Sequence, residues 1–121
     1  MDNLNFRIAQ GSTPRLELEL PFQLPDSGVK AYVTFSQGGV NVLEYSYPSG
    51  SATPAIAGTG ELNVDAHGRA GFILEMTQAD TFSLAAGDVE LQVRLKTPDG
   101  VDTFEPLVGE VMKAKKGGVI S

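Results

Sequence analysis

The sequence predicts an all-β protein, an antiparallel β-sandwich of about seven to eight strands with one short helical link. Three observations lead to this fold class. Apolar and polar residues alternate along several short runs, which is the period of a half-buried strand. Turn residues separate these runs at the spacing of an all-β domain. Helix signals are confined to one segment. A small β-barrel would give the same periodicity and stays open as the alternative.

Alternation is clearest in three runs. In residues 15–20, three leucines alternate with one arginine and two glutamates. In residues 88–96, valines and leucines at the odd positions alternate with charged or amide residues at the even positions. Residues 29–37 place apolar side chains on one face and a β-forming tyrosine and threonine on the other. The remaining strand candidates are residues 41–47, 59–64, 69–76 and 101–111.

Turn residues join these runs. The segments "PDSG" (25–28) and "QGG" (37–39) each separate two strands, and the second is typical of a hairpin turn. In "TPDG" (97–100), proline, aspartate and glycine stand in the order of a type I turn closed by a glycine bulge. The strand before it should therefore fold back on residues 101–111. Because Pro106 cannot donate to a sheet, we expect this last strand to lie at an edge or to contain a bulge.

The helical link is predicted just before residues 88–96. Thr77 is a suitable N-cap, and Asp80 three residues later completes a capping-box pattern. Phe82 and Leu84 can turn inward, and Gly87 is expected to end the segment. About two helical turns fit in this space.

The domain organisation is simple. Residues 1–112 are predicted to form a single sandwich domain, near the commonest domain length. Residues 113–121 are predicted to be a flexible C-terminal tail with an apolar pair near its end. Residues 47–60 consist largely of Gly, Ser, Pro, Thr and Ala and predict a long exposed loop.

Composition excludes several classes of function. The chain contains no cysteine, which excludes disulfides and thiolate chemistry. Its formal net charge is −6, with 15 acidic and 9 basic residues, so we expect no nucleic-acid partner. The first ten residues lack the features of a signal peptide, and no apolar run approaches the ~20 residues of a membrane span. We expect a protein that is made in the cytoplasm, is not secreted and has no membrane partner.

A search for chemistry finds no candidate enzyme site. The single histidine, His67, has only Asp65 nearby in sequence, and a polar turn explains the pair more simply than a metal site. No serine lies in a nucleophile elbow, and no glycine-rich loop leads a lysine into a helix. We therefore predict no catalytic residue, no metal site and no cofactor. The protein is predicted not to be an enzyme.

The order of several short motifs carries a family resemblance. The chain resembles small structural proteins of tailed phages and prophages of Gram-positive bacteria, and is similar to the Ig-like N-terminal domain of siphophage upper baseplate proteins. The segment "TQADTF" looks like that family's habitual link "L-T-Q-E-D-T-L". The loop at 47–60 is a departure from the pattern. The motifs, in order, are "QGSTP" (10–14), "LPF" (20–22), "QGGVNVLE" (37–44), "LEMTQADTF" (74–82), "VELQVRLKTPDG" (89–100) and "GGVI" (117–120).

The resemblance implies an Ig-like sandwich and a non-enzymatic role in tail or baseplate assembly. The partners it implies are copies of this chain, as a homo-oligomer in the particle, and other tail or baseplate proteins. The location it implies is the virion, after synthesis in the host bacterial cytoplasm. Basic and apolar residues of the tail and residues of the 47–60 loop are the predicted contact sites: Lys113, Lys115, Lys116, Val119, Ile120, Pro54 and Ile56.

Two alternatives remain from different classes. A compact acidic protein could be a phage-encoded inhibitor that occupies a basic channel of a host defence or metabolic protein. A carbohydrate-binding module is the less favoured alternative. It would need an aromatic platform, for which Tyr32, Tyr45, Tyr47 and Phe72 are the candidates. Core packing explains these aromatic residues more simply, because the chain has no tryptophan.

Overall fold

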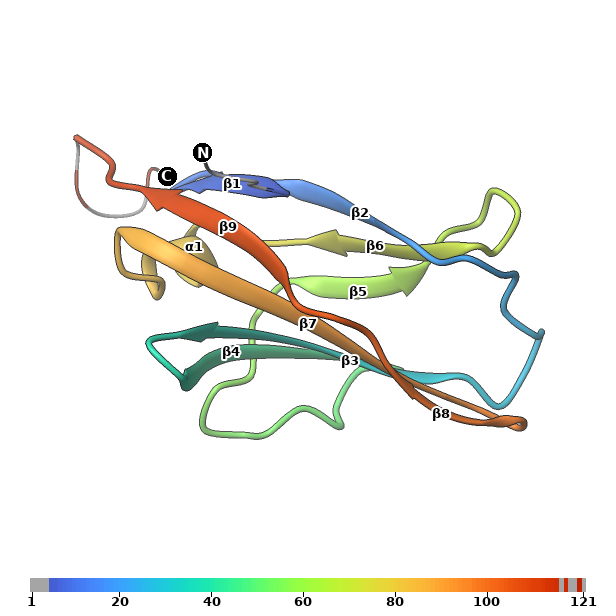
Figure 1. The fold of residues 1–121 in the computed structure, drawn as a ribbon. Coiled ribbons are helices and arrows are strands. Elements are labelled where there is room, and N and C mark those ends of the chain that lie inside the picture. The colour runs from blue at the N-terminus through green and yellow to red at the C-terminus, as the bar shows by residue number, and fades with distance from the viewer. Residues whose placement is uncertain (1–4, 116, 118–119, 121) are drawn as a thin grey trace.

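Two β-sheets pack face to face in the computed structural model of this chain (Figure 1). The structure describes residues 5–115, 117 and 120. In this part the strands are Phe6–Ala9 (β1), Arg15–Glu19 (β2), Lys30–Gln37 (β3), Val40–Tyr47 (β4), Glu61–Val64 (β5), Gly71–Glu75 (β6), Gly87–Thr97 (β7), Gly100–Thr103 (β8) and Leu107–Met112 (β9), and the helix is Gln78–Phe82 (α1). The predicted all-β sandwich with one short helical link is confirmed.

The strand order is that of an immunoglobulin-like fold. The larger sheet has the order β1-β9-β7-β3-β4, with β8 pairing with the end of β7, and the smaller sheet has the order β2-β6-β5. Three central strands widened by β4 on one side and facing a second sheet are typical of variable-type immunoglobulin domains. The first strand, β1, belongs to the larger sheet and leaves β2 at the edge of the smaller one.

Two details of the strand prediction are corrected. The described residues form nine strands rather than seven or eight, partly because β1 is too short for its alternation to be recognised. The pairing is also not wholly antiparallel, since β1 runs parallel to β9, with Phe6 opposite Gly109 and Ile8 opposite Val111. A parallel pair requires a long connection, and here almost the whole domain separates the two strands.

The last predicted strand is divided in two. Residues 104–106, which include Pro106, separate β8 from β9, and both strands pair with β7. Of the two expectations for this strand, the edge position does not hold for β9, because β1 pairs along its other side; the strand is instead interrupted around Pro106.

Both predicted hairpins are confirmed. Gln37 pairs with Val40 across a two-residue turn in which Gly38 and Gly39 both have positive φ, as a type I′ turn requires. Thr97 pairs with Gly100 at the tip of the β7–β8 hairpin.

The helix starts as predicted and ends earlier. The Thr77 side chain accepts a hydrogen bond from the Asp80 backbone N–H, at 3.2 Å, which confirms the N-cap. The helix is followed by Ser83, and Gly87 is the first residue of β7 rather than the helix stop. Leu84 is buried as expected. The Asp80 side chain points into the protein and does not complete a capping box.

The core lies between the two sheets. Alternate residues of β3 and β7 face inward and are buried, including Val33, Phe35 and Leu91. Phe72 and Leu74 of β6 meet them from the smaller sheet. Burial of this apolar surface is the main term that holds the layers together, at about 25 cal/mol per Å².

Candidate functional site

The predicted contact residues fall into two separate groups. In the tail, Lys113 and Lys115 are exposed, while Lys116 and Val119 lie outside the described residues. Ile120 has an exposed side chain, and its backbone forms two hydrogen bonds of 2.8 Å with the side-chain amide of Gln78, at the start of α1. The described part of the tail therefore reaches the helix end of the molecule.

The second group lies on the segment between β4 and β5. Pro54 is exposed and Ile56 is half-buried. The Ile56 carbonyl accepts a hydrogen bond from the Glu44 backbone N–H, and the Glu44 carbonyl accepts one from the N–H of Gly58. The Glu44 carboxylate also accepts a hydrogen bond from the Thr53 N–H. The predicted loop is thus present, but it is bonded along the outer edge of β4.

A buried carboxylate fixes the end of this loop. Asp80 is 4% exposed, and its two oxygens accept hydrogen bonds from four donors. The Thr59 N–H and the Thr59 hydroxyl donate to Oδ1, each at 2.8 Å. The Tyr45 hydroxyl and the Gly60 N–H donate to Oδ2, at 2.6 and 2.8 Å. A carboxylate has about four acceptor positions, so all are used and none is left for a substrate.

This network shifts the acidity of both partners. Burial alone would raise the pKa of Asp80, but hydrogen bonds from the backbone of Thr59, from Tyr45, from the Thr59 hydroxyl and from Gly60 outweigh it and lower that pKa below its ordinary value. Burial, the hydrogen bond to Asp80 and the charge of Asp80 all raise the pKa of Tyr45. Asp80 is therefore a structural anion and Tyr45 a structural donor.

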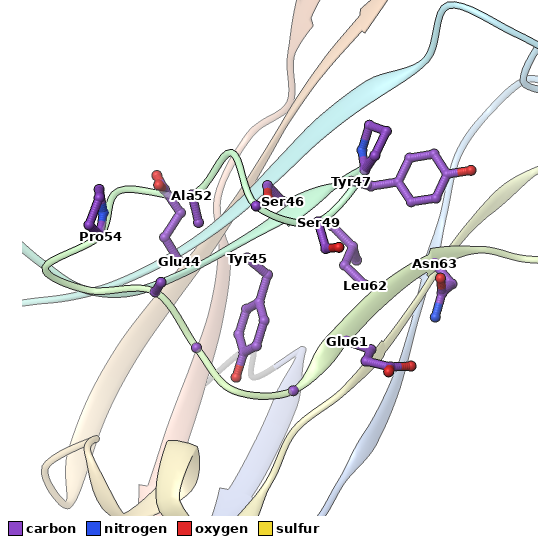
Figure 2. Close-up of a pocket in the computed structure, with 15 residues that line it drawn as sticks. Glu44, Tyr45, Ser46, Tyr47, Ser49, Ala52, Pro54, Glu61, Leu62 and Asn63 are labelled. Atoms are coloured by element: carbon purple, nitrogen blue, oxygen red, sulfur yellow. The ribbon is translucent and has the colours of Figure 1, made fainter.

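The loop lines an open pocket of mixed polar and apolar character against β4 and β5, which we call the loop pocket. Its volume is about 620 Å³. Figure 2 shows Glu44, Ser46 and Ser49 on the side of β4 and the loop, with Glu61 and Asn63 on the side of β5. Its walls bear two carboxylates and no basic side chain. The pocket suits small polar or cationic groups better than anions.

A second groove lies on the opposite flank, between β2 and the β7–β9 side of the larger sheet; we call it the β2 groove. Its volume is about 480 Å³. Apolar side chains such as Leu20, Phe104 and Leu107 line it, and Glu17 and Glu105 are among its acidic residues. Within the described residues, no strand pairs with the outer edge of β2.

Register shows which backbone groups of β2 are free to bind. The Leu20 N–H donates to the Ala70 carbonyl, and the Pro14 carbonyl accepts a hydrogen bond from the Met76 N–H. The backbone N–H and C=O groups of the even-numbered residues of β2 therefore point toward β6. The backbone groups of the alternate residues, Glu17 among them, point away from β6 toward the groove side. An apolar floor beside unpaired backbone groups is the arrangement that accepts an added strand.

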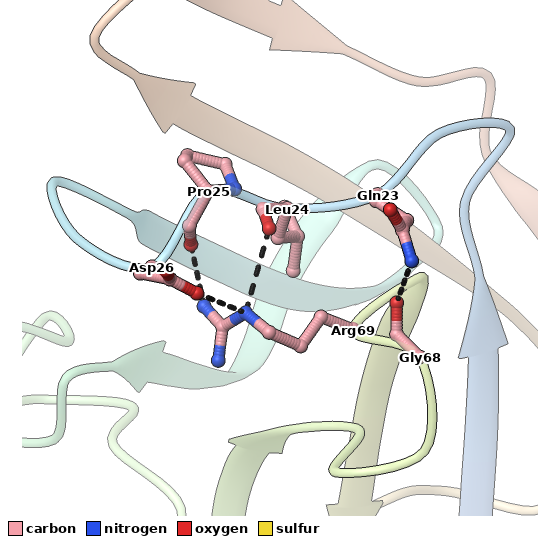
Figure 3. A network of polar contacts seen from close by, with 6 residues as sticks. All are labelled: Gln23, Leu24, Pro25, Asp26, Gly68 and Arg69. Carbon is pink, nitrogen blue, oxygen red and sulfur yellow. Dashed lines mark hydrogen bonds and ion pairs between the residues drawn. The ribbon is translucent and has the colours of Figure 1, made fainter.

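The far end of the sandwich is closed by polar contacts between two loops (Figure 3). The Arg69 guanidinium donates to the carbonyls of Leu24 and Pro25 and lies 3.7 Å from a carboxylate oxygen of Asp26. The Gln23 side chain donates to the Gly68 carbonyl at 2.9 Å. These contacts tie the β2–β3 loop to the β5–β6 turn, and they use the polar groups for structure.

Asp65 and His67, the pair with metal-ligand side chains, form part of the β5–β6 turn. Asp65 Oδ1 accepts a hydrogen bond from the His67 backbone N–H at 2.9 Å, and the His67 side chain is exposed. Across the residues that the structure describes, no three His, Cys, Asp or Glu side chains are grouped as metal ligands. Among the described residues, no helix is long and apolar enough to span a membrane.

The four aromatic residues considered for sugar binding do not share a surface. Tyr45 and Phe72 are buried in the core, at 3% and 0% exposure. Tyr47 packs edge-on against Phe72, with ring centroids 5.9 Å apart, and Tyr32 lies on the outer face of the larger sheet. No platform results from this arrangement.

Sequence reasoning missed the central role of Asp80 and the β2 groove. The signal for Asp80 was present in the N-cap pattern, but the pattern suggested a bond to the helix backbone.

A comparison of the sequence with models of known protein families found no match, and a comparison with curated proteins also found none.

Proposed function

We propose that this chain is a non-enzymatic structural component of a phage virion, in the tail or baseplate, that acts through protein–protein contacts. The proposal includes copies of the same chain and neighbouring tail or baseplate proteins as partners. It includes synthesis in the host cytoplasm followed by incorporation into the particle. The family resemblance of the ordered motifs is its starting point.

The observation that carries the proposal is the open edge of β2 beside the β2 groove. A strand edge next to apolar side chains is a site for adding a segment of another protein. The saturated bonding of Asp80 supports a structural rather than a catalytic use of the most buried charge. The exposed tail lysines, Lys113 and Lys115, are suited to the acidic rim of such a groove.

The direct test is quantitative peptide mass spectrometry on purified particles of the phage that encodes the chain. We expect the chain at a fixed ratio to the major tail protein. Its absence from particles, together with abundance in infected cells, would contradict the proposal. A second test deletes residues 113–121: we expect impaired assembly with the circular dichroism spectrum unchanged. Normal particles from this deletion would remove the tail as a contact site.

A second candidate function is inhibition of a host defence or metabolic protein. The observation that favours it is the smaller sheet, whose outer face carries Glu17, Glu19, Glu61 and Glu75. Such a face could occupy a basic channel by charge complementarity. Isolation of a one-to-one complex with a single host protein, dissociated by salt, would favour this candidate over the virion role.

A further inference from the structure

The outer face of the larger sheet carries two lysines directly opposite one another. Lys30 of β3 pairs in register with Lys96 of β7, and Tyr32 pairs with Arg94 in a neighbouring row. The three cationic residues are exposed. We call Lys30, Arg94 and Lys96 the basic patch. Like charges directly opposite on neighbouring strands destabilise a sheet, so folding alone does not favour this pair.

No acidic side chain compensates the basic patch within its own rows. Arg94 donates to the Thr103 hydroxyl at 3.1 Å, and among the described residues it forms no ion pair. Val101 is opposite Lys96 on the other side and is 58% exposed. Asp102 is opposite the inward-facing Leu95, so its side chain lies on the face of β8 away from the basic patch. The patch is therefore a cationic and partly apolar surface.

The smaller sheet has the opposite arrangement on its outer face. Glu61 of β5 pairs in register with Glu75 of β6. Glu17 and Glu19 of β2 lie on the same face, and all four are exposed. We call these four residues the acidic patch. Arg15, opposite Glu75, is the one cation among the outward-facing residues of β2, β5 and β6.

Contact between the basic patch of one copy and the acidic patch of another would reduce the repulsion in both like-charge pairs, Lys30–Lys96 and Glu61–Glu75. The two patches lie on opposite layers of the sandwich, because each is on the outer face of its own sheet (Figure 1). One copy can therefore place its basic patch on the acidic patch of a second copy and still offer its own acidic patch to a third. Such a contact is head-to-tail rather than two-fold, and repetition gives a ring or a filament.

We propose that copies of this chain stack head to tail through their sheet faces, with Lys30, Arg94 and Lys96 of one copy against Glu17, Glu19, Glu61 and Glu75 of the next. This proposal rests on the proposed assembly role and names the partner as a second copy. Opposed charges would set the register and the rate of association, and the contact would weaken as salt screens it.

A charge-swap experiment tests it with the full chain. One variant carries Lys30→Glu and Lys96→Glu, and the other carries Glu61→Lys and Glu75→Lys. Each variant alone removes the opposition of charge between its basic and acidic patches, so we expect its self-association to weaken by about tenfold or more, measured by sedimentation velocity at low salt. In an equal mixture the faces are complementary again, and we expect association to return.

The matched control is Asp26→Lys with Asp88→Lys, which makes the same change in net charge as Glu61→Lys with Glu75→Lys at exposed positions outside both patches. It should leave self-association unchanged, and an equal loss there would overturn the patch assignment. Wild-type protein that stays monomeric at all concentrations and salts, or a mixture that fails to associate, would also overturn it. The patches would then be sites for charged partners of other sequence.

Single substitution separates binding from folding. Lys30→Glu replaces a like-charge pair with an opposite-charge pair, so we expect the urea midpoint to rise while self-association falls. A fall in both would overturn the inference, because a merely structural patch loses stability when it is altered. Failure of this experiment leaves the virion proposal standing, since the particle mass spectrometry does not depend on self-stacking.

Discussion

The two flanks of the sandwich are built differently. On one flank, between β4 and β5, the segment after Tyr47 (the green loop in Figure 1) forms hydrogen bonds with the backbone of β4 and with the Asp80 carboxylate. On the other flank, the outer edge of β2 has no paired strand within the described residues, and an apolar groove lies beside it. One edge is covered by the chain itself, and the other is available.

The difference shows how one small fold can control its strand edges. An uncovered edge is a template for pairing with another chain, and proteins cover the edges at which pairing would be harmful. Here the covering segment is fastened by a saturated buried carboxylate, which makes the closed flank rigid and costly to open. Among the described residues, no buried carboxylate fastens the open flank, so changes there should affect binding more than folding.

The largest expected effect comes from removing the anchor of the closed flank. Asp80→Ala leaves the Tyr45 hydroxyl and the backbone N–H groups of Thr59 and Gly60 without their acceptor. We expect a loss of at least about 3 kcal/mol in the free energy of unfolding, measured with urea. Asp88→Ala, at an exposed position of β7, is the control and should leave the midpoint unchanged. Equal effects of the two substitutions would show that the network is not an anchor.

A somewhat smaller effect is expected where the loop meets β5. A Cβ on Gly60 would overlap the Glu75 backbone carbonyl, which cannot move without disturbing β6. We expect Gly60→Ala to reduce the free energy of unfolding by about 2–3 kcal/mol. Gly117→Ala is the matched control, because a Cβ there meets open space. A neutral result for Gly60→Ala would mean that the closed flank is more adaptable than its contacts indicate.

Acid should weaken the closed flank through the same carboxylate. The pKa of Asp80 is lower in the folded protein than in the unfolded chain, so the unfolded state binds the proton first. The contribution of Asp80 is present above the ordinary aspartate pKa and is lost as pH falls through the lowered one. Urea midpoints measured across this range should fall less in Asp80→Asn than in the wild type. Parallel curves for the two proteins would contradict the assignment.

The smallest effects compare single glutamates on the two flanks. Glu44→Gln weakens the contacts of its carboxylate with the Thr53 N–H and the Thr34 hydroxyl, so we expect a loss of about 1 kcal/mol. Glu105→Gln alters the exposed rim of the β2 groove and should change unfolding by less than about 0.5 kcal/mol. If Glu105→Gln is the more damaging, the open flank also contributes to folding.

The strand and turn content was predictable because its causes are local. The leucines of residues 15–20 and the valines and leucines of residues 88–96 alternate with the period of a strand, whatever lies around them. The glycines at 38 and 39 permit the positive φ of a tight hairpin, and Thr77 caps a helix through a contact three residues away. Each of these features depends on neighbours in the chain.

The candidate sites depend on residues far apart in the chain. Asp80 meets Tyr45 and Thr59, which are 35 and 21 residues away, and no short pattern announces these contacts. The open edge of β2 exists because β1 pairs with β9, and the opposed lysines at 30 and 96 become neighbours only through the β3–β7 register. Sequence by itself determined the period, the turns and the cap, since backbone sterics and alternating burial act locally. Tertiary structure alone decided which edge is covered and which charges face one another, because those depend on the packing of all the strands together.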